Sequence, residues 1–294
     1  MLILAIDTAL DACAAGVLDT EAGAMIAQES QAMKRGHAEA LMPLLARVIK
    51  QAGIAFSALD RIAVTTGPGS FTGLRVGLSA ARGIALAAAK PVVGLTTLSA
   101  YAAPHVSEHG THPILSAIDA RHDHVYMQVV SGNGATLLRP RVASMTEALD
   151  AAQFGAPLLV GNAAKLIADR WPTDAEPPLL VDPQPAPDIA WVAWLGAAVT
   201  PDNAPARPLY LRAPDAKPSN NALQRAAPAA PRATGWRGCG AGARRWSRRR
   251  RCAMRRRWRS CMARRSIAAG ARVNLKPCCA SRTRWCTGCG GAAR

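Results

Sequence analysis

The chain has 294 residues, of which 36 are Lys or Arg and 19 are Asp or Glu, so its formal net charge is +17. Residues 218–294 hold 20 of the basic residues and none of the acidic ones, which leaves residues 1–217 at −3. A charge of +17 suggests a partner such as nucleic acid or an anionic membrane, but that interpretation is excluded for all but the last quarter of the chain.

Residues 1–217 are long enough and apolar enough to bury a sizeable core in one or two domains. They contain only one of the eight cysteines, Cys13, so we expect no disulfide framework and a reducing compartment. The longest apolar run, residues 189–200, is too short to span a bilayer. The apolar N-terminus lacks the basic residues of a signal peptide and contains Asp7 and Asp11. We therefore expect a cytoplasmic protein with no membrane association.

Residues 1–110 are predicted to form the first of two similar subdomains. An apolar strand is followed by two alternating strands and by a helix over 38–52, in which Pro43 predicts a start near Leu41 or a kink. The other predicted elements are strands at 1–7, 12–18, 23–29, 61–66 and 91–95, and a helix at 72–89.

Residues 111–217 are predicted to form the second subdomain, because the pattern of a strand ending on Asp begins again near His112. The predicted elements are strands at 113–119, 124–130, 138–142 and 157–160, helices at 146–152, from Asn162 and at 189–200, and a Pro-rich surface loop at 177–187. Two rounds of antiparallel strands followed by alternating helices and strands predict an α/β duplication.

A glycine-rich turn, residues 67–73, leads directly from a strand into a helix. Ser70 or Thr72 can cap that helix, and its free N–H groups suit an anion, although the sequence is neither a Walker loop nor a nucleophile elbow. Asp7 and Asp119 each end a strand and could hold Mg²⁺ with a nucleotide across a cleft. The alternative is ordinary turn chemistry that seats a helix on a sheet. The candidate nucleotide or anion residues are Asp7, Thr8, Gly67, Gly69, Ser70, Thr72 and Asp119.

The helix at 72–89 is rich in small residues. Each interior glycine costs about 1 kcal/mol relative to alanine, so several of them imply the close approach of another backbone. With the apolar face of the helix at 38–52, this predicts a surface for a partner; the alternative is that both faces cover the sheet. The candidate partner-binding residues are Leu41, Leu45, Val48, Gly73, Gly77, Ala80, Ala81 and Ile84. On the partner interpretation, Leu at Gly77 or Ala81 would abolish docking without affecting the fold.

The histidines do not form a recognisable metal motif. Pro and Gly interrupt the helical spacing of His105, His109 and His112, and His37 lacks the second His of a zincin helix. The histidines therefore give no support to a metalloprotease.

Residues 218–294 are rich in Arg, Ala, Gly and Pro and have no helical or strand period, so we expect a disordered tail. Because these residue types and the scattered Trp and Cys are typical of GC-rich DNA read out of frame, we hypothesise a frameshift between about 218 and 236. One alternative is unspecific nucleic-acid binding, with the Arg runs 248–251 and 255–257 on phosphates and Trp246 and Trp258 stacking on bases. A zinc knuckle is poorly supported, because its upstream cysteine pair is adjacent in sequence.

Five segments together resemble one protein family. They are residues 3–8, residues 67–75, Asp119 to Arg121 with Tyr126, Gly161-Asn162, and Tyr210 to Arg212. In order and spacing, over residues 1 to about 217, the sequence closely resembles the TsaB (YeaZ) family. The resemblance implies an actin/Hsp70/sugar-kinase-like (ASKHA) fold of duplicated subdomains. It also implies a role in forming N6-threonylcarbamoyladenosine (t6A) at position 37 of tRNAs that read ANN codons.

The resemblance further implies a non-catalytic subunit. TsaB is similar to TsaD, the subunit that transfers the threonylcarbamoyl group, and TsaD-like proteins carry an H-x-x-x-H metal pair in the segment aligned with residues 94–101. Here those two positions hold Thr97 and Tyr101, which are poor ligands for a transition metal. The alternatives left open are an active ASKHA-type nucleotide hydrolase or phosphotransferase, and a nucleic-acid binder driven by the tail.

The partners implied by the resemblance follow from that role. They are a TsaD-like catalytic subunit docked on the first two helices, a TsaE-like ATPase, a second copy of the chain when it is alone, and tRNA only through the complex. The chain would have no cofactor of its own, and ATP with Mg²⁺ and a metal would belong to the partner subunits.

Overall fold

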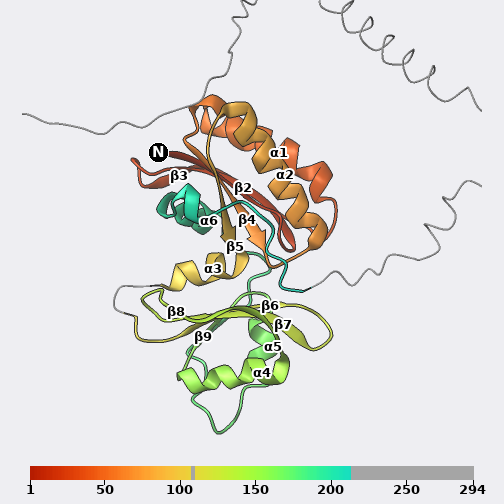
Figure 1. The fold of residues 1–294 in the computed structure, drawn as a ribbon, viewed down its shortest axis with the longest axis vertical. Helices are drawn as coiled ribbons and strands as arrows, with labels where there is room; N and C mark the ends of the chain where they lie inside the picture. Colours follow the sequence, from red (N-terminus) through yellow and green to blue (C-terminus); the bar gives the residue numbers. More distant parts are fainter. Residues whose placement is uncertain (107–109, 213–294) are drawn as a thin grey trace, which may run out of the picture. The chain divides into compact units, whose positions relative to one another are not determined.

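The computed structural model describes residues 1–106 and 110–212, which lie in one compact unit. This part contains two five-stranded mixed sheets (Figure 1), which confirms the predicted α/β duplication. The tail at 218–294, with the hypotheses about disorder, a frameshift, nucleic acid and zinc, lies outside the described residues.

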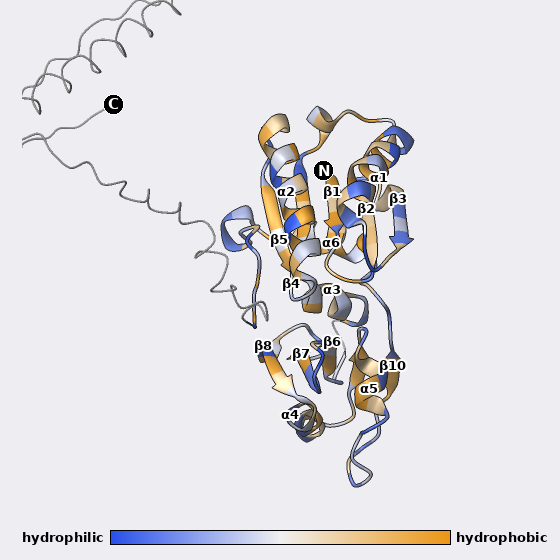
Figure 2. Ribbon diagram, turned by 90° about the vertical axis from the view of Figure 1, so that its right-hand side faces the viewer, coloured by the Kyte–Doolittle hydropathy of each residue, from blue (hydrophilic) through white to orange (hydrophobic). Residues whose placement is uncertain are grey.

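The first sheet has the strand order β3-β2-β1-β4-β5. Its strands are β1 (Leu2–Asp7), β2 (Ala12–Asp19), β3 (Ala24–Ala32), β4 (Arg61–Gly67) and β5 (Val92–Thr96). The first three pair antiparallel, whereas β4 pairs parallel with both β1 and β5. The central strands are nearly continuous apolar runs because both of their faces are buried, while the second half of β3 at the edge, from Gln28 to Gln31, is hydrophilic (Figure 2).

Helices cover both faces of this sheet. On one face lie α1 (His37–Ala52) and α2 (Phe71–Ala88), and on the other lies α6 (Ile189–Ala198). The predicted bounds of α1, 38–52, agree with the structure, but the alternative start near Leu41 is wrong, because the helix begins at His37 and contains Pro43. Burial of six of its side chains, each worth about 1.5–3 kcal/mol if large and apolar, outweighs the cost of about 3 kcal/mol for a helical proline.

The second sheet has the order β10-β9-β6-β7-β8. Its strands are β6 (Ile114–Asp119), β7 (His124–Val130), β8 (Thr136–Ser144), β9 (Leu158–Val160) and β10 (Leu180–Asp182). The helices α4 (Met145–Leu149) and α5 (Ala164–Ala168) pack on one of its faces. The segment at 177–187 is therefore not only a loop, because β10 within it pairs parallel with β9.

Two features connect the halves. The helix α3 (Thr97–Ala102), which was not predicted, packs against β6 and β7 of the second sheet. After the second sheet the chain returns to the first, where α6 packs and where Leu209 N donates to Thr66 O at 2.8 Å. The boundary near residue 110 thus separates the sheets, but residues 189–209 pack with the first of them. Short 3-10 helices lie at Phe56–Ala58, Ala103–His105, Asp150–Phe154 and Pro201–Asn203.

Candidate functional site

Asp7, the first candidate for a nucleotide site, is fully buried at the end of β1. Its Oδ1 accepts hydrogen bonds from Thr65 Oγ1 at 2.5 Å and from Ala9 N at 3.1 Å. Its Oδ2 is buried and has no hydrogen-bond partner among the described residues. Burial raises the pKa of the Asp7 carboxyl above its ordinary value of 3.8, and the hydrogen bonds oppose this only in part. Burial thus disfavours the charged form of this carboxyl.

The glycine-rich turn is fastened to the chain segment that follows Asp7. The Gly67–Pro68 peptide is cis, and Ser70 N donates to Ala9 O at 2.7 Å. The Ser70 hydroxyl caps α2 by accepting from Gly73 N at 3.3 Å, as predicted for this residue or Thr72. Thr72 is exposed. The N–H and the hydroxyl of Ser70 are therefore both used within the chain itself.

The small residues of α2 do mark a close backbone approach, and the other backbone belongs to this chain. A Cβ placed on Gly73 would lie 2.1 Å from Thr8 O, and one on Gly77 would lie 2.4 Å from Thr8 Oγ1. One on Gly69 would lie 2.3 Å from Ala9 O. Thr8 Oγ1 also donates to Gly73 O at 2.7 Å. The glycines thus seat α2 against the turn after β1.

This packing corrects most of the predicted partner surface. Six of its residues are buried inside the first subdomain, and Ala80 and Ile84 are only partly exposed. These six residues therefore follow the alternative interpretation, in which the two helices cover their own sheet. A Leu at Gly77 or Ala81 would damage the fold itself, so the prediction that such variants lose docking alone is wrong. The six are Leu41, Leu45, Val48, Gly73, Gly77 and Ala81.

Asp119 has surroundings opposite to those of Asp7. It is exposed, its N–H donates to Asn162 Oδ1 at 2.9 Å, and its Oδ1 accepts from Arg121 N at 2.7 Å. Apolar side chains from both halves form one cluster between the two sheets: Ala9, Leu10, Leu74, Leu98, Tyr101, Ala102, Ile114, Ile118, Val130 and Val160. A nucleotide with Mg²⁺ needs accessible carboxylates and room for phosphates. Asp7 is fully buried and so offers no accessible carboxylate to such a group, and the nucleotide site stays a prediction.

The positions aligned with the metal pair of TsaD-like proteins lie on α3. Thr97 is fully buried, and the Tyr101 hydroxyl donates to Gln184 O at 2.9 Å. Burial raises the pKa of Tyr101, so its hydroxyl stays protonated. Over residues 1–106 and 110–212, no three His, Cys, Asp or Glu side chains are grouped so that they could hold a metal ion.

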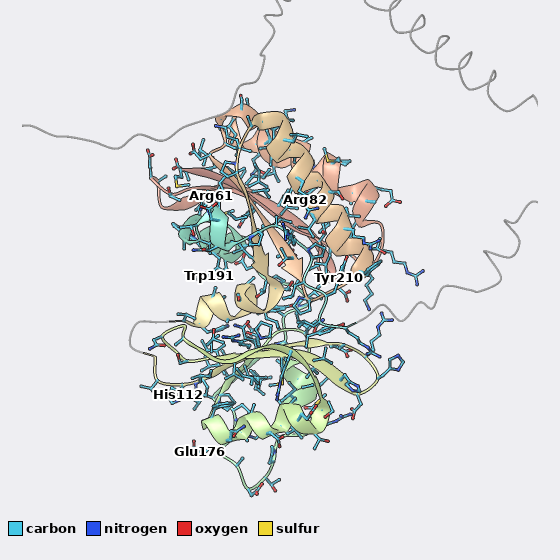
Figure 3. The ribbon with its side chains drawn as sticks, viewed as in Figure 1. Arg61, Arg82, His112, Glu176, Trp191 and Tyr210 are labelled. Carbon is cyan, nitrogen blue, oxygen red and sulfur yellow. The ribbon has the colours of Figure 1, made fainter. Side chains whose placement is uncertain are left out.

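A cation–aromatic cluster at the start of α2 was not predicted. The rings of Phe71 and Tyr210 have centroids 5.3 Å apart, and the Arg75 guanidinium carbon lies 3.8 Å from the Phe71 centroid. Arg75 Nε donates to Tyr210 Oη at 3.2 Å, and Figure 3 shows Tyr210 beside this end of α2. The sequence motifs contained all three residues, but nothing in the local pattern indicated that they meet.

Two similar subdomains, each built on a mixed sheet whose first three strands are antiparallel, define the class of this protein as a duplicated ASKHA-like fold. A family model described as tRNA N6-adenosine threonylcarbamoyltransferase (TsaD) matches residues 25–171. A solved YeaZ structure from Pseudomonas aeruginosa superposes with a TM-score of 0.58 at 26% identity, covering 71% of this chain and 99% of that chain.

Sequence relatives point the same way. The tRNA threonylcarbamoyladenosine biosynthesis protein TsaB of Escherichia coli is 34% identical over 126 residues, which are 43% of this chain and 53% of that protein. An uncharacterised Mycobacterium tuberculosis protein is 33% identical over 216 residues, 74% of this chain and 94% of its own length. The chain belongs to the TsaB (YeaZ) family. Its match spans about half the length of the curated TsaB relatives. Within the described part, no helix is both long and apolar enough to cross a membrane.

Proposed function

We propose that this protein is a non-catalytic partner subunit for t6A formation at position 37 of tRNAs that read ANN codons. It binds a TsaD-like catalytic subunit, helps to recruit a TsaE-like ATPase, and works in the cytoplasm, where it meets tRNA only through the complex. The observation that carries the proposal is membership of the TsaB family, whose named members are t6A biosynthesis proteins.

The surroundings of the candidate nucleotide residues support the non-catalytic part of the proposal. A phosphotransfer site requires positioned carboxylates and a metal at the phosphates. Here Asp7 is buried and bonded to Thr65, and its pKa is raised because burial disfavours the carboxylate. The alternative of an active nucleotide hydrolase would need a different arrangement of the same residues.

The docking surface that we propose lies where α1 and α2 adjoin, on the side away from the sheet. One flank of α1 is marked by Arg47, which pairs with Glu29 on β3 at 2.6 Å. Because successive residues turn by about 100° in a helix, Met42 and Ala46 lie on the other flank, toward α2. Met42 is 54% exposed although it is apolar.

The facing flank of α2 is found in the same way. Arg82 donates to Ala206 O and so marks the flank toward the returning chain. Ala80 and Ile84 lie on the opposite flank, toward α1, and are partly exposed. We call the apolar surface formed by Met42, Ala46, Ala80 and Ile84 the α1–α2 crease. It keeps two residues of the predicted partner surface and replaces the six buried ones.

A charge placed in the crease tests the docking surface. We expect Met42→Glu and Ala80→Glu each to reduce co-purification with the TsaD-like protein at least about tenfold, because a carboxylate buried in an apolar interface has no partner. The matched controls are Gln51→Glu on α1 and Ser79→Glu on α2, which are exposed outside the crease. Full binding by both crease variants would show that the TsaD-like protein docks elsewhere.

The role itself is tested by reconstitution. We expect t6A formation on a tRNA reading an ANN codon, by the TsaD-like and TsaE-like proteins, to require this chain. We also expect light scattering to find a homodimer of the chain alone, which the crease variants convert to monomer. Calorimetric binding of Mg-ATP to the chain alone, with a dissociation constant well below about a millimolar, would instead support the nucleotide-hydrolase alternative.

A further inference from the structure

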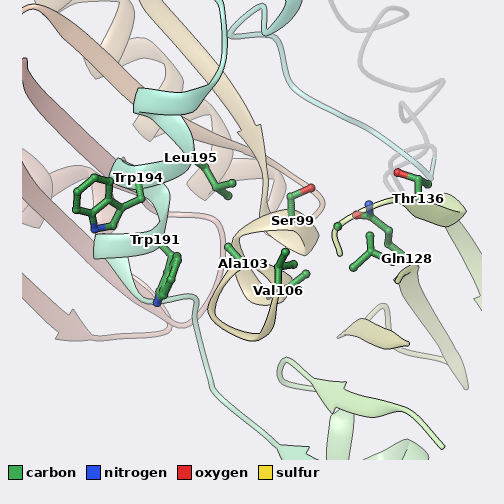
Figure 4. Close-up of a pocket in the computed structure, with 11 residues that line it drawn as sticks. Ser99, Ala103, Val106, Gln128, Thr136, Trp191, Trp194 and Leu195 are labelled. Carbon is green, nitrogen blue, oxygen red and sulfur yellow. The ribbon is translucent and has the colours of Figure 1, made fainter. Parts of the chain in front are cut away.

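A pocket of about 470 Å³ lies between α3, α6 and the β7–β8 hairpin (Figure 4). Ala102, Ala103 and Val106 line it from the α3 side, and Trp191, Trp194 and Leu195 from α6. Its volume is within the range of small-molecule sites, roughly 300–1,000 Å³. Neither the proposed function nor the family resemblance assigns a role to these residues.

One polar group in the pocket lacks a partner. Gln128 on β7 is only 6% exposed, and its Oε1 is buried without a hydrogen-bond partner among the described residues. Along β7, Gln128 alternates with Tyr126 and Val130, which pack in the apolar cluster between the sheets. An unpaired buried acceptor costs about 1–3 kcal/mol. A hydrogen-bond donor on a ligand would remove this cost.

The remaining lining determines what kind of molecule could supply that donor. Among the described residues that line this pocket there is no Asp, Glu, Lys, Arg or His, so these residues would not compensate a charged ligand for its lost hydration. Trp191 is partly exposed, whereas the ring of Trp194 packs against the apolar cluster of the first sheet and points away from α3 (Figure 4). Indole rings offer large apolar faces that stack on other planar rings. The hydroxyls of Ser99 and Thr136 add polar groups at the lining.

We propose that this pocket binds a neutral, planar heteroaromatic molecule that carries an N–H group. Its ring packs between the Trp191 indole and the apolar side chains on the α3 side, and its N–H donates to Gln128 Oε1. The pocket is separate from the α1–α2 crease. If the pocket does not bind the probes in the experiment below, the proposed function is therefore unaffected.

Ligand-detected saturation-transfer NMR on the full chain tests the site with indole and 1-methylindole. These probes share a ring system and differ in the N–H group. We expect indole to bind about fivefold more tightly than 1-methylindole, the value of one hydrogen bond. Absence of transfer to both probes, or equal affinity for the two, overturns the proposal.

Two variants and a control localise the binding. Gln128→Met should bring indole down to the affinity of 1-methylindole, and it should fold because it removes an unpaired polar group. Thr136→Trp, at an exposed rim position, should block both probes. Gln31→Met, on β3 of the other sheet, should leave both affinities unchanged. If indole keeps its advantage in Gln128→Met, or if both probes bind Thr136→Trp normally, the pocket is not the site.

Discussion

Two glycines of α2 have opposite surroundings. A Cβ on Gly73 would meet Thr8 O at 2.1 Å, whereas one on Gly83 would have nothing within 4 Å. We expect Gly73→Ala to lower the free energy of unfolding by about 1–3 kcal/mol through overpacking. Gly83→Ala should raise it by about 0.5–1 kcal/mol, because alanine is the better helix former. Urea unfolding of both variants gives the comparison. Equal effects would mean that α2 is not seated on the turn after β1.

Asp7 makes stability depend on pH. Because burial raises the pKa of Asp7 in the folded state, the folded protein binds this proton more tightly than the unfolded chain does. The resulting contribution to the free energy of unfolding is fully present below the ordinary pKa of 3.8. It is lost as the pH rises through the higher pKa of the folded state. Asp7→Asn cannot ionise, so its unfolding free energy relative to that of the unmodified chain should increase as the pH rises from about 4 to 7.5. Denaturant unfolding across that range measures the difference, and a constant difference would contradict the assigned direction.

At the scale of elements, Arg61 anchors α6 to the first sheet. Its Nη1 donates to Gly196 O and to Val199 O, both at 2.7 Å. These carbonyls lie at the C-terminal end of α6 (Figure 3), where the partial negative charge of the helix dipole stabilises a cation. We expect Arg61→Met to lower the unfolding free energy by about 1.5–3 kcal/mol, the loss of hydrogen bonds to a charged donor.

The control for Arg61 is Arg47→Met. Arg47 pairs with Glu29 at 2.6 Å, but its side chain is 51% exposed. Exposed ion pairs contribute little, so this variant should change the urea midpoint much less than Arg61→Met does. A larger loss at Arg47 than at Arg61 would show that the return of α6 does not depend on this contact.

At the scale of the whole molecule, the net charge of +17 combines −3 in residues 1–217 with +20 in residues 218–294. Any affinity of the full chain for tRNA alone should therefore fall steeply as the salt concentration rises. For each phosphate that the chain neutralises, a tenfold increase in salt lowers the logarithm of the binding constant by about 0.7–0.9. Ending the chain at Lys217 should abolish this binding. Filter binding at several salt concentrations measures it, and the thermal midpoint of the truncated chain checks its fold. Undiminished binding after truncation would place the tRNA contact within residues 1–217.

Local signals in the sequence were sufficient for most of the elements. Near-continuous apolar runs predicted β1, β4 and β6, and the glycine turn with Ser70 predicted the start of α2, because each depends on neighbouring residues. The helix α3 and the strand β10 were missed. Both are short, and their stability comes from contacts with distant segments such as β6 and β9.

By itself, the sequence determined the duplicated α/β fold, the family and the separation of charge between body and tail, because periodicity, motif order and composition can be read along the chain. Only the tertiary structure decided what the small residues of α2 approach, whether Asp7 is open to solvent, and where the last helix packs. Those outcomes depend on which distant backbones come together. The same glycines would suit a partner protein or the chain's own Thr8, and only the packed fold shows that Thr8 occupies the space.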